Sequence, residues 1–324
     1  MPSRHPRLAA VALATTALTL LAGGPASAVD PTVTDPRVIA HFDFAEGQTP
    51  ENIALEPDGS ADITFAFAHA IARVNKQGAW KTIATLPDVA NPQTPNIGAA
   101  IALGIARAHD GTLYAAYATG TAETGIWRIA PGGGTPEQIA QLPADAFPNG
   151  IALDEHCDTL YAADSNRGEV WSIPLSGGDP TVWASGAALA PSPQLPFGAN
   201  GLKIHDDAVW VSNTAQGTLL RIPFGPDRTA GPIETRAVGL TGIDDFAFTG
   251  HGDTVLAALN SVNELELVRA DGTHKTVLTA ADGLDNPTSV AVRAKTVYVN
   301  SAAFFDTTNP DPNLLLARIS RNKL

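Results

Sequence analysis

The sequence predicts an all-β fold, a six-bladed β-propeller, on three observations. Short apolar runs rich in β-forming residues alternate with turns that contain Asp, Asn, Pro and Gly. These runs recur in similar units about 44 to 52 residues apart, close to the roughly 40–50 residues of one propeller blade. No segment shows a sustained helical periodicity.

The repeating unit is clearest in residues 147–174, where turns separate three apolar runs. An equivalent first-strand core begins at six positions: Ile53, Ile105, Ile151, Leu202, Phe246 and Val290. A polar turn follows each core and leads into a second predicted strand, at residues 63–67, 112–116, 159–163, 208–212, 254–259 and 296–300.

Third and fourth strands complete the units. Third strands are predicted at residues 70–74, 125–129, 169–173, 218–222, 264–268 and 315–319, and fourth strands at 81–86, 137–142, 181–184, 234–238 and 275–278. The sixth unit has no fourth strand, but residues 37–42 resemble the fourth strand of the first unit in sequence pattern. We therefore predict that this N-terminal strand closes the last blade, which removes the exposed edges of an open array.

The first 28 residues are expected to form a signal peptide. They begin with the basic residues Arg4 and Arg7, continue with an apolar stretch over residues 8–21, and end with Ala26-Ser27-Ala28, which suits signal-peptidase cleavage. No later apolar run is long enough for a membrane span. We expect residues 29–324 to form a single propeller domain that is secreted to the extracellular space.

Composition limits the partners. The formal net charge of −13 predicts a surface that repels nucleic acid and anionic lipid, so neither is expected as a partner. Cys157 is the only cysteine, which excludes an internal disulfide, and we interpret it as an incidental thiol in a turn. The acidity also suits a protein that holds a cation, although acidic exported proteins are common. We expect a monomer.

The residue two positions before each first-strand core carries the functional prediction. In a propeller these six positions converge on the central channel at one face, and here they hold Glu51, Leu103, Asn149, Asn200, Asp244 and Thr288. Side-chain oxygens are the donors that Ca²⁺ prefers, and the His and Cys ligands expected for zinc are absent. We predict a site for Ca²⁺ or another divalent cation, formed by Glu51, Asn149, Asn200 and Asp244. Alternatively, Asn-Gly and Asp merely turn the chain into each strand.

These motifs give the sequence a family resemblance. With PENIAL around Glu51, PNGIAL around Asn149, ANGLKI around Asn200 and IDDFAF around Asp244, the chain resembles the SMP-30/gluconolactonase/LRE-like six-bladed propellers. More distantly it resembles the paraoxonases and strictosidine synthase-like proteins. The resemblance implies a divalent metal bound by Glu51, Asn149 and Asn200. It also implies that Asp244, with Asp245 beside it as an additional candidate, matches a further acidic ligand of the paraoxonases.

Two departures from the gluconolactonase pattern bear on the chemistry. Glu51 begins Glu-Asn-Ile instead of Glu-Gly-Pro, and Asn200 replaces the Asp that the gluconolactonase branch uses as both ligand and general base. An amide cannot accept a proton at neutral pH, so lactonase chemistry in that form is in question. The paraoxonase-like branch tolerates Asn at this position.

The leading functional prediction is a secreted Ca²⁺-dependent hydrolase of a small-molecule lactone or ester. The metal would polarise the carbonyl group or activate a water molecule. Candidate catalytic residues are Asp245 and Asp244, since not both need bind the metal, and His69, which follows the second strand of the first unit. The equivalent turns of later units hold Asp164, Asn213, Asn260 and Asn300, and turn formation is the simpler explanation for these residues and for His69.

Two alternatives remain open at this point. One is a non-catalytic extracellular propeller that binds a ligand or a protein and holds a structural Ca²⁺; the other is a lyase-type relative. A propeller fold by itself does not decide between them. Phe304 and Phe305, in the long loop 301–313, could form an apolar lid over the site or pack against a neighbouring blade.

Overall fold

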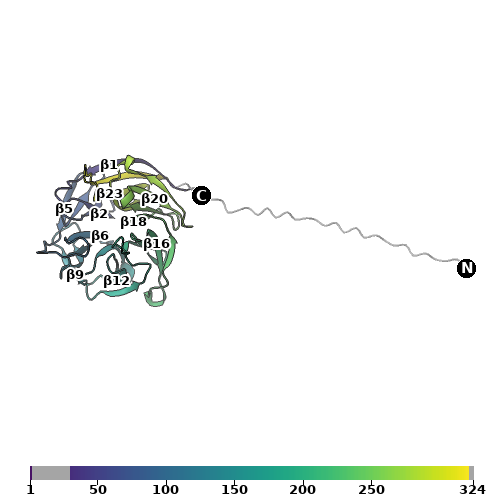
Figure 1. The fold of residues 1–324 in the computed structure, drawn as a ribbon, viewed down its shortest axis with the longest axis horizontal. Helices are drawn as coiled ribbons and strands as arrows, with labels where there is room; N and C mark the ends of the chain where they lie inside the picture. The colour runs from purple at the N-terminus through teal and green to yellow at the C-terminus, as the bar shows by residue number, and fades with distance from the viewer. Residues whose placement is uncertain (2–29, 321–324) are drawn as a thin grey trace. The chain divides into compact units, whose positions relative to one another are not determined.

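The computed structural model describes Met1 and residues 30–320, and residues 31–320 form six four-stranded antiparallel sheets arranged in a ring (Figure 1). The predicted six-bladed β-propeller is therefore confirmed. The predicted signal peptide, apart from Met1, lies outside the described residues.

In each of the first five blades the four strands follow the order of the sequence. Blade 1 contains β2 (Pro50–Leu55), β3 (Ala61–Phe65), β4 (Ala70–Val74) and β5 (Trp80–Thr85). Blade 2 contains β6 (Ile101–Arg107), β7 (Leu113–Ala118), β8 (Gly125–Ile129) and β9 (Glu137–Gln141). Blade 3 contains β10 (Pro148–Asp154), β11 (Thr159–Asp164), β12 (Glu169–Pro174) and β13 (Thr181–Ser185).

Blades 4 and 5 repeat this arrangement. Blade 4 contains β14 (Ala199–His205), β15 (Ala208–Asn213), β16 (Thr218–Pro223) and β17 (Glu234–Ala237). Blade 5 contains β18 (Ile243–Phe248), β19 (Val255–Leu259), β20 (Glu264–Val268) and β21 (His274–Leu278). Four single-turn 3₁₀ helices lie in connections: η1 (Glu155–Cys157), η2 (Pro226–Arg228), η3 (Asn260–Val262) and η4 (Ala280–Asp282).

Blade 6 combines both ends of the described chain. It contains β22 (Pro287–Arg293), β23 (Thr296–Ser301) and β24 (Asn313–Ser320), and β1 (Thr32–His41) is its outermost strand. β1 runs antiparallel to β24, with pairing from Thr32 opposite Ser320 to His41 opposite Asn313. The predicted closure of the last blade by the N-terminal strand is confirmed (Figure 1).

Apolar side chains fill the spaces between neighbouring blades. Ile71 and Ala84 of blade 1, for example, pack with Leu113 and Tyr117 of blade 2 in one buried cluster. The alternation of side chains along each strand sends one set of residues toward each neighbouring blade, so both faces of every sheet are covered. Each blade thus depends on the next, and the ring folds around its channel as a unit.

Every first strand contains a β-bulge near its start. In blade 1, Pro50 pairs with Phe65 and Ile53 pairs with Ile63, so Glu51 and Asn52 face only Thr64. An equivalent shift by one residue interrupts the first strands of the other five blades. Pairing resumes on both sides of the bulge. The first strands therefore begin earlier than the predicted cores and include the residues on which the metal prediction rests.

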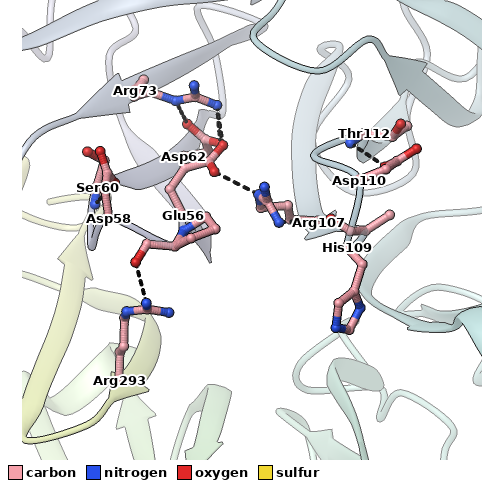
Figure 2. Close-up of polar contacts among 12 residues, drawn as sticks. Glu56, Asp58, Ser60, Asp62, Arg73, Arg107, His109, Asp110, Thr112 and Arg293 are labelled. Atoms are coloured by element: carbon pink, nitrogen blue, oxygen red, sulfur yellow. Dashed lines mark hydrogen bonds and ion pairs between the residues drawn. The ribbon is translucent and has the colours of Figure 1, made fainter.

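Charged side chains join blade 1 to its two neighbours (Figure 2). Arg73 contacts Glu56 at 2.5 Å and Asp62 at 2.6 Å, and Arg107 of blade 2 donates to Glu56 at 2.8 Å. Arg293 of blade 6 donates to the carbonyl oxygen of Pro57. Burial raises the pKa of Asp62 to about 6, although the bonds from Arg73 oppose that rise. This network lies on the first-hairpin side of the blades.

Removing β1 tests the closure of the ring. We expect a chain that begins at residue 42 to lose solubility or to melt at least about 10 °C lower, because β24 would become an exposed edge and its apolar contacts with β1 would be lost. Circular dichroism melting and size-exclusion chromatography measure both effects. A chain that begins at residue 29 is the control, and equal melting temperatures for the two chains would contradict a structural role for β1.

Candidate functional site

A cavity of about 510 Å³ lies at the channel end where the first strands begin. Its lining includes Glu51 of β2, Asn149 of β10, Asn200 of β14 and Asp244 of β18. All four side chains belong to residues that are less than 9% exposed. The structure therefore brings the four predicted ligands together, each from a different blade.

Two glycines allow these strands to approach closely. Gly150 follows Asn149 inside β10, and a Cβ atom at Gly150 would lie 2.6 Å from the carbonyl oxygen of Asn200. A Cβ atom at Gly201, inside β14, would lie 2.4 Å from the Asp245 carboxylate. Both contacts are too short for any residue except glycine. The two Asn-Gly pairs therefore serve close packing between blades, and they do not turn the chain into a strand.

Hydrogen bonds fix the orientation of both asparagine amides. Asn149 Nδ2 donates to Ser165 Oγ at 3.3 Å, and Asn200 Nδ2 donates to Thr214 Oγ1 at 2.9 Å. Each hydroxyl in turn donates to a backbone carbonyl of the next blade. Because the NH₂ groups are held in this way, the amide oxygens are left to accept other partners.

Two buried oxygens of this group have no hydrogen-bond partner in the structure, Glu51 Oε2 and Asn200 Oδ1. Buried polar atoms are nearly always satisfied, and an exception in a cavity indicates a bound ion or molecule. Carboxylate and amide oxygens from separate chain segments are suitable ligands for a hard cation such as Ca²⁺. The residues present therefore fit a divalent cation.

The pKa shifts of the carboxyl groups in the site also fit a bound divalent cation. Burial, together with the charge of the nearby Asp245, raises the pKa of Glu51 to about 8. Burial also raises the pKa of Asp244 well above its ordinary value, with added repulsion from Glu51 and Asp245 and an opposing hydrogen bond from Asn200. Carboxyl groups crowded in this way resist ionisation until a cation offsets their charge.

Asp245 is held differently from its neighbour. Lys203 Nζ donates to both Asp245 carboxylate oxygens at 2.7 Å, and Asn52 Nδ2 donates to Oδ2 at 3.3 Å. Asp245 is not part of the cavity lining, whereas Lys203 lines a separate hollow with residues farther along the first strands. The ion pair therefore lies deeper in the channel than the four-oxygen group.

The other candidate from the sequence, His69, is not part of the cavity lining. It sits in the turn before β4, and its Nε2 lies 2.9 Å from the carbonyl oxygen of Ala100 in the next connection. Of the residues in the equivalent turns, Asn260 lines the cavity. Asp164 instead accepts from the backbone amides of Phe147 and Arg167, as a turn-forming residue does.

Six phenylalanines surround the cavity, and the sequence analysis anticipated only the two in the loop 301–313. The set is Phe44, Phe67, Phe147, Phe197, Phe304 and Phe305. Phe147 and Phe197 come two and three residues before Asn149 and Asn200, so their position beside the ligand motifs was the signal that could have revealed them. Of the remaining two, Phe44 lies in the connection between β1 and β2, and Phe67 lies in the turn between β3 and β4.

Within the described part of the chain, a second group of possible metal ligands comprises His205, Asp206 and Asp253. These residues belong to first-hairpin turns, at the opposite face from the cavity. Their ligand atoms lie within 4.8 Å of one another, but Asp206 is exposed and the His205 ring stacks on Phe248 at 3.8 Å. This group offers a control for the channel site.

No family model matches the sequence, and no curated protein matches it. Several solved structures, however, have a similar fold. The PQQ-bound aldose sugar dehydrogenase of Streptomyces coelicolor has a TM-score of 0.64 at 18% identity, over 90% of this chain and 99% of its own. The calcium-binding protein regucalcin of Agrobacterium tumefaciens has a TM-score of 0.64 at 16% identity, over 88% of this chain and 93% of its own.

A third solved structure, of a protein assigned as a gluconolactonase, has a TM-score of 0.60 at 15% identity, over 89% of this chain and 92% of its own. These likenesses support the propeller fold, and a shared fold does not by itself assign a function. Among residues 30–320, no helix is long and apolar enough to cross a membrane.

Metal content tests the channel site. We expect the full chain, dialysed to equilibrium against millimolar Ca²⁺, to hold about one ion per chain in excess of the dialysate by elemental mass spectrometry, because four oxygen ligands converge in one cavity. The double variant Glu51→Gln/Asp244→Asn should retain none. The matched control Asp206→Asn/Asp253→Asn should keep its ion. Loss of the ion only in the control variant would show that the metal binds at the opposite face and not in the channel cavity.

The buried Glu51 carboxyl also predicts a pH dependence of stability. Its pKa is about 8 in the folded chain and its ordinary value is 4.5, so the folded state retains a proton that the unfolded state releases. The resulting stabilisation is complete below about pH 4.5 and is lost as the pH rises through about 8.

We therefore expect the melting temperature of the chelated protein to fall by on the order of 5 °C between pH 5 and pH 8. Glu51→Gln should flatten this slope, since the amide does not titrate. Added Ca²⁺ should restore stability at pH 8. A melting temperature of the metal-free protein that rises over this interval would contradict the burial of a protonated Glu51.

Proposed function

We propose that this protein is a divalent-cation-dependent hydrolase of a lactone or ester. The observation that supports it is a group of four buried oxygen ligands, two of whose oxygens lack partners, at the inner end of a 510 Å³ cavity. A purely structural ion is usually enclosed by protein ligands on all sides, whereas a catalytic ion faces space for a substrate. Here the ligands border such a space.

In the proposed site, Glu51, Asn149, Asn200 and Asp244 hold the cation. When bound, the cation would stabilise negative charge developing on a carbonyl oxygen and lower the pKa of a water molecule. The hydrogen bonds of Asn149 and Asn200 to Ser165 and Thr214 keep the amide oxygens directed away from those hydroxyls. This preorganisation reduces the cost of assembling the site.

Asp244 is the proposed proton acceptor. It is a carboxyl group in the cavity, and a bound cation would offset the burial and the charges of Glu51 and Asp245 that raise its pKa, so that the group could ionise and accept a proton. Asn200 itself cannot accept a proton, which separates this site from the gluconolactonase pattern. Asp245, bound on both oxygens by Lys203, is assigned the role of positioning the β18 bulge that carries Asp244.

Calcium is the proposed cation, and secretion through a signal peptide at residues 1–28 is the proposed route. The all-oxygen ligand set supports calcium, and one of the similar structures is of a calcium-binding protein. Extracellular calcium modules bind with dissociation constants of roughly 10⁻⁴ to 10⁻³ M. A site with two carboxylates and two amides is suited to that range.

Two variants at adjacent positions test the assignment of the base. With Ca²⁺ saturating and one bound ion per chain verified for the variant, Asp244→Asn should lower kcat on a responsive lactone by about 10²- to 10⁴-fold, because it removes the proton acceptor. Asp245→Asn should keep the bound ion and lose no more than about tenfold. Hydrolysis is followed by pH-stat titration and ion content by elemental analysis.

The reverse outcome would be informative. If Asp245→Asn abolished turnover while the ion remained bound, Asp245 would be the base. If Ca²⁺ raised only the melting temperature and no lactone or ester of a broad panel were hydrolysed, the hydrolase proposal would fail. The alternative from the sequence, a non-catalytic binding propeller with a structural Ca²⁺, would then replace it.

A further inference from the structure

The walls of the cavity differ in chemistry from its inner end. Phe44, Phe67, Phe147, Phe197, Phe304 and Phe305 all line it, whereas the carboxylates lie in the first strands. Phe67 and Phe304 meet edge to face with ring centres 5.9 Å apart, and Phe147 and Phe197 do so at 5.7 Å. Five different connections between strands thus contribute to one aromatic wall.

Three of these rings are exposed. Phe44 is 37% exposed, Phe67 39% and Phe305 64%, and they are the only exposed phenylalanines of the described chain. Exposed apolar rings weaken solubility, so their concentration around one cavity indicates a surface used for binding. The core does not need them there, since each blade already covers its faces with buried residues.

The charged and polar residues of the cavity lining also restrict the kind of substrate that it suits. Its described lining contains no Lys, Arg or His, and its acidic residues are Glu51 and Asp244, both assigned to the cation. An anionic substrate would therefore meet acidic groups without a cationic side chain to offset its charge. Apart from the proposed ligands, the polar lining comprises Asn96, Thr214, Asn260 and Ser261, and Thr214 is already bonded to Asn200 and to the carbonyl oxygen of Ile243. A polyhydroxylated ring would therefore place several of its hydroxyl groups against phenylalanine, and each unpaired hydroxyl weakens binding.

We infer that the substrate is a neutral ester or lactone with an alkyl or aryl substituent, and that its apolar part lies against the phenylalanine wall. A sugar lactone does not suit this wall. The inference rests on the proposed hydrolase function, because it assigns the carbonyl group of the substrate to the four-oxygen end of the same cavity. A volume of about 510 Å³ accommodates such a molecule.

A substrate series tests the inference on the full chain with Ca²⁺. We expect kcat/KM for δ-lactones with side chains from methyl to heptyl to rise about fourfold per methylene until the cavity is filled. Glucono-δ-lactone should be at least about 100-fold poorer than the heptyl lactone. A flat series, or a preference for the sugar lactone, would overturn the apolar substrate class while leaving the hydrolase proposal intact.

Binding provides a readout independent of turnover. The matching alkyl δ-lactams, which resist hydrolysis, should bind by titration calorimetry with affinity that rises along the series and with a negative heat-capacity change. If lactams bound with this trend but no lactone were hydrolysed, the hydrolase proposal would fail and the apolar ligand class would stand. Absence of any trend in lactam binding would contradict the inference.

A pair of exposed apolar residues supplies the matched variants. Phe305→Ser should weaken binding of the heptyl lactam by about three- to tenfold, because a ring of the wall is lost. Val238→Ser changes a residue that is 62% exposed, compared with 64% for Phe305, and lies outside the cavity lining. It should leave lactam binding unchanged. Equal effects of both variants would indicate that the wall does not contact the ligand.

Discussion

The site depends on one constraint of the backbone, the extra residue in each first strand. A regular strand would alternate its side chains strictly between the two faces of its blade, and the residues near its start would pack against a neighbouring sheet. The bulge interrupts this alternation over two residues and re-aims a side chain, as bulges next to functional sites often do. Because the bulge recurs at the same place in every blade, five equivalent residues line the cavity at one channel end: Glu51, Leu103, Asn149, Asn200 and Asp244. Four of them carry carboxylate or amide oxygens, and the sixth residue, Thr288, is buried and donates to the carbonyl oxygen of Pro50.

A bulge leaves backbone groups without ladder partners, and side chains of the second strands satisfy them. In blade 1, Thr64 Oγ1 accepts from the bulged Asn52 amide at 3.0 Å and donates to the carbonyl oxygen of Leu103 in blade 2 at 2.6 Å. In blade 4, Ser212 accepts from the Gly201 amide at 2.7 Å and donates to the carbonyl oxygen of Asp244 in blade 5. In both blades one hydroxyl stabilises a bulge and bonds to the first strand of the next blade. In blade 5 that strand carries Asp244, so the position of this ligand depends on the blade before it.

The sequence predicted the features that local pattern and repetition encode. The residue pattern and the spacing of the predicted strands indicated six blades. The missing fourth strand of the last unit indicated closure by residues near the N-terminus. Comparison of one position across the repeats found Glu51, Asn149, Asn200 and Asp244, which the structure places in one cavity. The Lys203–Asp245 ion pair and the contact of Gly201 with Asp245 join different blades, so no local pattern reveals them. His69 shows the same limit. Its turn is recognisable from the local sequence, but the distance of that turn from the channel depends on the arrangement of the whole blade, which no local pattern reveals.

The phenylalanine wall and the four-oxygen end of the cavity also influence each other physically. Burial is the largest cause of the raised pKa values of Glu51 and Asp244, and phenylalanine rings line the same cavity as both residues. A wetter cavity would leave both groups as ordinary solvated acids with weak attraction for a cation. In a dry one, each buried negative charge gains strongly from a divalent ion, because electrostatic interactions are less screened there. The apolar wall that we assign to the substrate therefore also strengthens the cation site, and a residue change in either part is expected to be felt in the other.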